Sequence, residues 1–171
     1  MLWGKRYVPT YTNPIELKKL NKGPEISMKL VEEYKTFCKE NIYDTGKGLW
    51  AAEPWCQKEL SVTEELAKRE AEISSKAIYV IGRNAGEDKD LKKIKGSWFL
   101  QDEECNSIKN LCKYFESVII VYNTCGIIDT SWINDECFNG KIKAVLYAWQ
   151  GGQEGGKACA NILCGAAVPS A

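Results

Sequence analysis

The sequence predicts an α/β fold with a mostly parallel sheet, and three observations lead to this prediction. Short apolar runs at residues 77–81 and 118–122 have the length and composition of strands buried in a parallel sheet, and residues 143–147 are predicted as a third strand. Segments with a helical period follow the first and the third of these predicted strands, at 102–116 and 154–163. Strands that alternate with helices are typical of parallel sheets with right-handed crossovers.

The segments before and between these elements are predicted to be partly irregular and partly helical. Residues 1–25 contain three prolines and are expected to be irregular. Apolar positions over 26–40 predict a helix, and the glycine-rich segment 41–54 predicts a loop. A Ser-x-x-Glu capping box begins a further helix over 61–74. A helical turn is expected at 131–134.

The length and charge of the chain exclude several classes of protein. Its 171 residues are enough for one domain with its own core. Lys and Arg total 23, as do Asp and Glu, so nothing in the net charge favours nucleic acid or an anionic membrane as partner. No apolar run is long enough to span a membrane, and the first residues lack the apolar segment of a signal peptide.

The cysteines and the missing histidines restrict the chemistry. None of the eight cysteines forms a C-x-x-C pair, so we expect reduced, mostly buried thiols and a cytoplasmic protein. The sequence contains no histidine, the commonest metal ligand and general base. We therefore expect no metal or other cofactor, and any acid/base chemistry falls to carboxylates, Lys, Tyr or Cys.

The loop after the first predicted strand, G-R-N-A-G-E-D-K-D at 82–90, concentrates carboxylates. Glu87, Asp88 and Asp90 stand within four residues beside glycines that allow a sharp turn. Glycoside hydrolysis uses two carboxyl groups, one of them an acid. A carboxyl in a partly closed pocket can protonate a leaving group. From spacing alone, a solvated charged loop remains the plainer interpretation.

The loop after the third strand, W-Q-G-G-Q-E-G-G-K, leaves three interpretations open. Trp149 could stack on a sugar, with Gln150 and Glu154 bonding its hydroxyls. Residues 151–157 also match most of a phosphate-binding P-loop, but Ala158 replaces the Ser or Thr that holds magnesium. Alternatively, the glycines only permit close packing.

The loop after the second strand, residues 123–129, is less specific. Its Cys125 could in principle be a nucleophile, but the chain has no histidine to activate it. Packing and a backbone turn are expected here.

Four blocks together resemble the C-terminal α/β-sandwich domain of glycoside hydrolase family 3. Members show I-G-R-x-A-G-E-x-x-D, K-G-S-Y-Y-L-T, L-N-x-G-x-x-I-D-x-S-W and A-W-Q-G-G-Q-E-G-G-x-A-x-A-D-x-L-x-G. The corresponding segments here are 81–90, 95–101, 122–132 and 148–165, within a resemblance that covers roughly residues 77–170. The resemblance implies a three-layer sandwich, here in an incomplete version, over residues 58–171. Residues 1–57 are expected to pack on it as an irregular and helical segment.

The resemblance also implies an activity and a partner. It implies a retaining β-glucosidase-type hydrolase acting on a β-glucoside or oligosaccharide, in which Glu87 is the favoured acid/base and Glu154 the alternative. It implies Asp90, Trp149 and Gln150 as substrate-binding residues. The nucleophile belongs to a separate (β/α)8 barrel, usually in an S-D-W motif that this sequence lacks, so the chain alone is expected to be inactive. A non-catalytic sugar-binding or structural remnant is the alternative, and a nucleotide-binding protein a weaker one.

Overall fold

The computed structural model describes residues 26–138 and 140–170, in two units. One unit is continuous, residues 44–149, and the other combines residues 26–43 with 150–170. Each is described by itself. The prediction for residues 1–25 lies outside the described part, and the predicted boundary after residue 57 stays a prediction.

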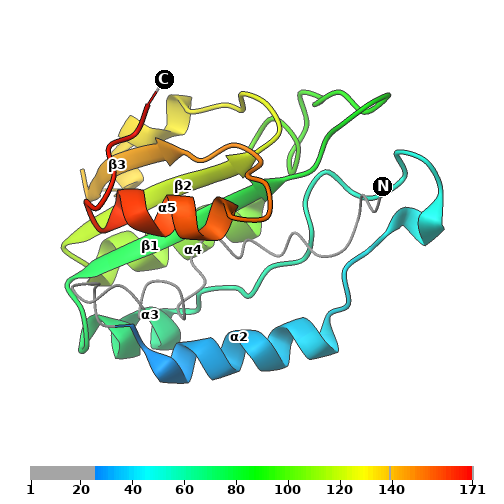
Figure 1. The fold of residues 1–171 in the computed structure, drawn as a ribbon. Helices are drawn as coiled ribbons and strands as arrows, with labels where there is room; N and C mark the ends of the chain where they lie inside the picture. Colours follow the sequence, from blue (N-terminus) through cyan, green and yellow to red (C-terminus); the bar gives the residue numbers. More distant parts are fainter. Residues whose placement is uncertain (1–25, 139, 171) are drawn as a thin grey trace. The chain divides into compact units, whose positions relative to one another are not determined.

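The unit of residues 44–149 contains a parallel sheet, as predicted. Its strands β1 (Lys76–Arg83), β2 (Ser117–Thr124) and β3 (Ile142–Tyr147) pair in the order β1-β2-β3 and lie side by side in Figure 1. The central strand β2 is the most buried of the three, whereas Lys143, Ala144 and Val145 of β3 are exposed. The fold class is therefore α/β.

Two helices of this unit form the layer behind the sheet. Helix α4 (Asp102–Tyr114) packs on β1 and β2, and α3 (Glu64–Ala71) packs on α4 (Figure 1). An apolar stripe on α4 meets the inward side chains of the strands, which creates the core. The most buried members of this core are Ala67, Ile81, Ile108, Cys112, Val118, Ile120, Tyr122, Ile128 and Phe138.

The remaining helices agree with the sequence prediction within a few residues. The second unit contains α2 (Met28–Glu40) and α5 (Gly155–Leu163). Short 3-10 turns are η2 (Gly46–Gly48), η3 (Ser131–Asn134) and η4 (Glu136–Phe138). No helix in the described part of the chain is both long and apolar enough to cross a membrane.

The predicted beginning of α3 was wrong. The cap is Thr63 rather than Ser61, because the Thr63 hydroxyl accepts a hydrogen bond from the Leu66 amide at 3.2 Å. The preceding backbone is held by α4 instead. The Val62 amide donates to Ser107 Oγ, and its carbonyl accepts from Asn110 Nδ2.

The cysteines also differ from the prediction. All eight are free thiols, but only Cys112 and Cys159 are buried, and Cys137 is exposed in η4. The other five are partly exposed. The expectation of mostly buried thiols was therefore wrong, because several cysteines lie in loops and at helix edges rather than in the core.

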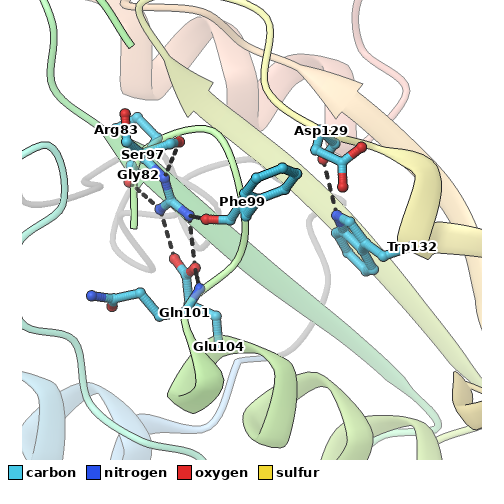
Figure 2. Close-up of polar contacts among 8 residues, drawn as sticks. All are labelled: Gly82, Arg83, Ser97, Phe99, Gln101, Glu104, Asp129 and Trp132. Carbon is cyan, nitrogen blue, oxygen red and sulfur yellow. Dashed lines mark hydrogen bonds and ion pairs between the residues drawn. The ribbon is translucent and has the colours of Figure 1, made fainter. Parts of the chain in front are cut away.

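A buried ion pair joins the end of β1 to the first turn of α4. The guanidinium of Arg83 bonds both carboxylate oxygens of Glu104 at 2.7 Å, and it donates to the carbonyls of Gly82, Ser97 and Phe99 (Figure 2). Glu104 also accepts from the Gln101 amide at 2.8 Å. Burial would lower the pKa of Arg83, but the hydrogen bonds and charge of Glu104 outweigh it and raise that pKa.

A second carboxyl lies beside this pair in a cavity of about 360 Å³. The cavity is lined by the segment 56–61 and by residues of β1 and α4, among them Tyr79, Glu104 and Ser107. Burial, reinforced by the charge of Glu104, raises the pKa of Glu59 from 4.5 to about 7, with Arg83 acting in the opposite direction. The ionised form of the Glu59 carboxyl is therefore less favourable, relative to its neutral form, in the folded chain than in the unfolded chain.

Replacing Glu104 by Gln should destabilise the fold strongly. The substitution leaves the buried Arg83 charge uncompensated, so we expect the free energy of unfolding to fall by about 3–5 kcal/mol. Denaturant unfolding measures this change. Glu103→Gln is the matched control, since its exposed side chain adjoins Glu104 in sequence and should change stability by less than about 0.5 kcal/mol. Equal effects of the two substitutions would contradict the role of the pair.

Replacing Glu59 by Gln should remove a pH-dependent loss of stability. Because the folded-state pKa is the higher one, wild-type stability falls as the pH rises from about 4.5 through about 7. We expect Glu59→Gln to be more stable than wild type by about 2–3 kcal/mol near pH 8, and the difference to shrink toward zero near pH 4. Thermal unfolding at several pH values tests this, with the exposed Glu65→Gln as control. A difference that does not depend on pH would refute it.

Candidate functional site

The carboxyl ends of the three parallel strands lie at the same end of the sheet, which we call the carboxyl edge. The loops singled out from the sequence begin there. Arg83 pairs with Thr124 at the end of β1 and β2, and Tyr122 pairs with Tyr147 at the end of β3. Ligands of open parallel sheets bind beyond this carboxyl edge. The edge is therefore the candidate functional site of the unit.

The first loop presents Glu87 on a tight turn. Gly86 and Lys89 exchange backbone hydrogen bonds, N to O, at 3.4 and 3.1 Å. Asp88 takes the left-handed conformation with φ 61°, which Asp tolerates better than most residues. Glu87 and Asp88 are both exposed at the turn, so Glu87 can be reached from solvent or by another domain.

The neighbours of Glu87 in sequence are engaged by two tryptophans. The indole Nε1 of Trp50 donates to Asp88 Oδ2 at 3.1 Å, and that of Trp55 donates to the Asp90 carbonyl at 3.0 Å. Asp90, which the sequence predicts as a substrate-binding residue, is exposed. The sequence prediction missed Trp50 and Trp55, although two tryptophans in a glycine-rich polar loop were a signal that could have revealed them.

Trp149 continues a row of aromatic rings at the end of β3. Its ring centroid lies 5.1 Å from that of Tyr147, which in turn lies 4.7 Å from that of Tyr122 in the core. Trp149 is 48% exposed and has a φ of 55°, an uncommon conformation for a bulky residue that concentrates at functional sites. The row leads from the core to an exposed aromatic face.

Gln150 and Glu154 belong to the second unit. Both are exposed, and Glu154 occupies the cap position of α5 without a side-chain capping hydrogen bond. The prediction that Glu87 and Glu154 share one edge stays a prediction, since the two residues lie in different units.

The middle loop is organised by its own hydrogen bonds. Thr124 Oγ1 donates to the Gly126 carbonyl, and the Asp129 carbonyl accepts from Trp132 Nε1 at 3.0 Å (Figure 2). Burial raises the pKa of Cys125. A raised thiol pKa makes the thiolate scarcer, which agrees with the expectation that Cys125 is no nucleophile.

Buried polar atoms without partners also gather at this edge. Within the described residues, the buried side-chain atoms without a hydrogen-bond partner are Lys89 Nζ, Tyr122 Oη and Asn123 Oδ1. All three belong to the end of β2 or the loop after β1. Buried polar groups are nearly always paired in native proteins, so these three atoms distinguish the edge from the core around Arg83. The sequence prediction did not include these residues.

No metal centre is evident at the site. In the described ranges, no group of three or more Cys, Asp or Glu side chains is arranged to hold a metal ion. The functional groups present at the carboxyl edge are carboxylates, a buried amine, an amide and exposed aromatic rings.

Comparisons with known proteins agree with this description. Residues 6–171 match the model of the glycosyl hydrolase family 3 C-terminal domain. A β-glucosidase of Ruminococcus albus is 37% identical over 86% of this chain, and β-glucosidase A of Butyrivibrio fibrisolvens is 34% identical over 68%. The chain spans only 15% and 16% of these relatives.

Solved structures show the same fold. A β-glucosidase from Paenibacillus barengoltzii superposes with a TM-score of 0.81 and 43% identity, over 83% of this chain and 15% of that one. β-Glucosidase 3B from Thermotoga neapolitana, at 24% identity, has a TM-score of 0.68 over 88% of this chain and 20% of its own. The chain therefore belongs to the glycosyl hydrolase family 3 C-terminal domain family.

Proposed function

We propose that this chain supplies the acid/base carboxyl, Glu87, and sugar contacts to a retaining β-glucosidase-type site that hydrolyses O-glycosyl bonds in carbohydrate metabolism. The barrel that carries the nucleophile is another domain, and the chain alone does not turn over substrate. We further propose that the protein works in the cytoplasm, since its eight cysteines are free.

One observation carries the proposal: the carboxyl edge of the sheet combines an accessible carboxyl with unpaired buried polar atoms. Glu87 stands exposed at the tip of a turn held by hydrogen bonds, beside the buried amine of Lys89. Trp149 adds an exposed aromatic face at the end of β3. The resemblance to β-glucosidase-like members, in which the acid/base is the glutamate of the A-G-E block, supports Glu87 over Glu154.

The need for a second domain follows from the chemistry of retention. A nucleophile and an acid/base must stand about 5 Å apart on opposite sides of the glycosidic bond. Asp88 adjoins Glu87 on one turn and is bonded to Trp50. Two neighbours on a two-residue turn do not flank both sides of a sugar, so Asp88 is no substitute for the missing nucleophile.

Reconstitution tests this function. The purified chain, assayed with an aryl β-glucoside, should show no turnover alone and gain it when a family 3 barrel with the S-D-W motif is added. In the reconstituted pair, Glu87→Gln should reduce kcat by about 10²–10⁴-fold, the usual contribution of a general acid. Asp88→Asn is the matched control from the same turn and should have a much smaller effect.

Other outcomes decide between the alternatives. Loss of turnover in Glu154→Gln but not in Glu87→Gln would assign the acid/base role to Glu154. Sugar binding by the chain without any turnover in the presence of barrels would favour the non-catalytic remnant. Turnover by the chain alone, abolished by Glu87→Gln, would refute the need for a partner domain.

A further inference from the structure

Trp55 ties together the two ends of the turn that carries Glu87. Its backbone carbonyl accepts a hydrogen bond from the Asn84 amide at 2.5 Å, just before the turn. Its indole Nε1 donates to the Asp90 carbonyl at 3.0 Å, just after the turn. One residue therefore fixes the separation between the chain entering and leaving the turn.

The ring of Trp55 adds a second kind of contact. Lys89 Nζ lies 5.6 Å from the ring centroid and Lys92 Nζ lies 5.4 Å from it. Lys89 is only 7% exposed, and its amine finds no hydrogen-bond acceptor in the described part of the chain. A cation over a tryptophan face is attracted more strongly when water is excluded, so the ring is the principal partner of the buried amine.

Further contacts reinforce this arrangement without reaching Glu87 itself. Asn84 Nδ2 donates to the Pro54 carbonyl at 3.3 Å, and Trp50 holds Asp88 at the tip. The segment 50–55 thus engages the loop before, at and after the turn. The Glu87 side chain takes part in none of these contacts and is exposed.

We propose that Trp55 is a positioning residue for Glu87, acting through the backbone of the turn rather than through substrate. This inference rests on the proposed acid/base role of Glu87. An acid must be held close to its productive geometry to protonate a leaving group, and small displacements are costly in rate. Trp55 supplies that constraint from a segment outside the strand-end loops.

The first test needs no activity and uses the 171-residue chain. Trp55→Phe keeps an aromatic ring but removes the hydrogen bond to Asp90. We expect amide hydrogen exchange at residues 86–89 to become on the order of 10-fold faster, as the loss of a hydrogen bond and a weakened cation–π contact imply. Trp132→Phe controls for the loss of such a bond elsewhere, because Trp132 Nε1 also donates to the backbone carbonyl of an aspartate, Asp129, at 3.0 Å, although its ring is buried in the core. Unchanged exchange in Trp55→Phe, or an equal increase in the control, would overturn the proposal.

Trp50→Phe keeps the test decisive if Trp55→Phe folds poorly. Trp50 is 70% exposed, so its substitution does not endanger the core, and it removes only the contact at the tip. Exchange should then rise by a few fold at most. A rise as large as that expected for Trp55→Phe would show that the tip contact, and not Trp55, holds the turn.

The second test reads out acid catalysis in the reconstituted enzyme. A misplaced acid slows glycosides with poor leaving groups more than a dinitrophenyl β-glucoside, whose leaving group needs no proton. Trp55→Phe should therefore lower kcat/KM, which reports the step that expels the leaving group, on the order of 10-fold more for an alkyl β-glucoside than for the dinitrophenyl substrate. An equal loss with both substrates would indicate a merely structural role and overturn the proposal.

Glu87→Gln separates the failure of this inference from the failure of the function on which it rests. If Glu87→Gln shows the leaving-group dependence and Trp55→Phe does not, only the positioning role is wrong. If Glu87→Gln itself shows none, the acid/base assignment is wrong whatever the exchange data show.

Discussion

The ion pair between Arg83 and Glu104 is the interaction on which the rest of the 44–149 unit depends. It joins the last residue of β1 to the first turn of α4, and the Arg83 side chain also holds the carbonyls of Ser97 and Phe99. The long loop between them is consequently closed at its base by one buried cation (Figure 2). A loop whose ends are fixed in this way loses less entropy when its tip is ordered, which suits a loop that carries the proposed acid/base carboxyl.

A buried ion pair is weak evidence for net stability, since apolar residues of similar volume often serve as well. Its value here is geometric. Five hydrogen bonds converge on one planar guanidinium, so strand, loop and helix are held at defined angles that apolar contacts alone would leave variable. Burial, together with the charge of Glu104, imposes a cost on Glu59, whose pKa is raised to about 7 although Arg83 acts in the opposite direction. The unit thus tolerates an unfavourable carboxyl beside the pair that organises it.

Most of the fold could be predicted from the sequence because it follows from local periodicity. The apolar runs became β1, β2 and β3, and the helical periods became α2, α4 and α5 with small shifts at their ends. The beginning of α3 was misplaced because Val62 is bound by Ser107 and Asn110, which lie more than 40 residues later in the chain. The A-G-E block likewise identified Glu87 as a candidate, but its supports, Trp50 and Trp55, lie in a segment without periodicity. Two tryptophans in a polar loop mark this segment, but the groups that they contact are set by tertiary structure and cannot be read from the local sequence.

The carboxyl edge differs from the core in how its polar groups are satisfied. The Arg83 guanidinium and the Glu104 carboxylate form two hydrogen bonds with each other, and Glu104 also accepts one from the Gln101 backbone (Figure 2). At the edge, Lys89, Tyr122 and Asn123 have buried polar atoms without hydrogen-bond partners, and the backbone of Trp149 is strained. Unpaired buried groups and strain both cost stability, so they persist only where the surrounding structure fixes them. The hydrogen bonds of Arg83 hold the base of the loop that carries Glu87, and part of the cost lies at the end of the sheet where we propose that another domain and a sugar meet this chain.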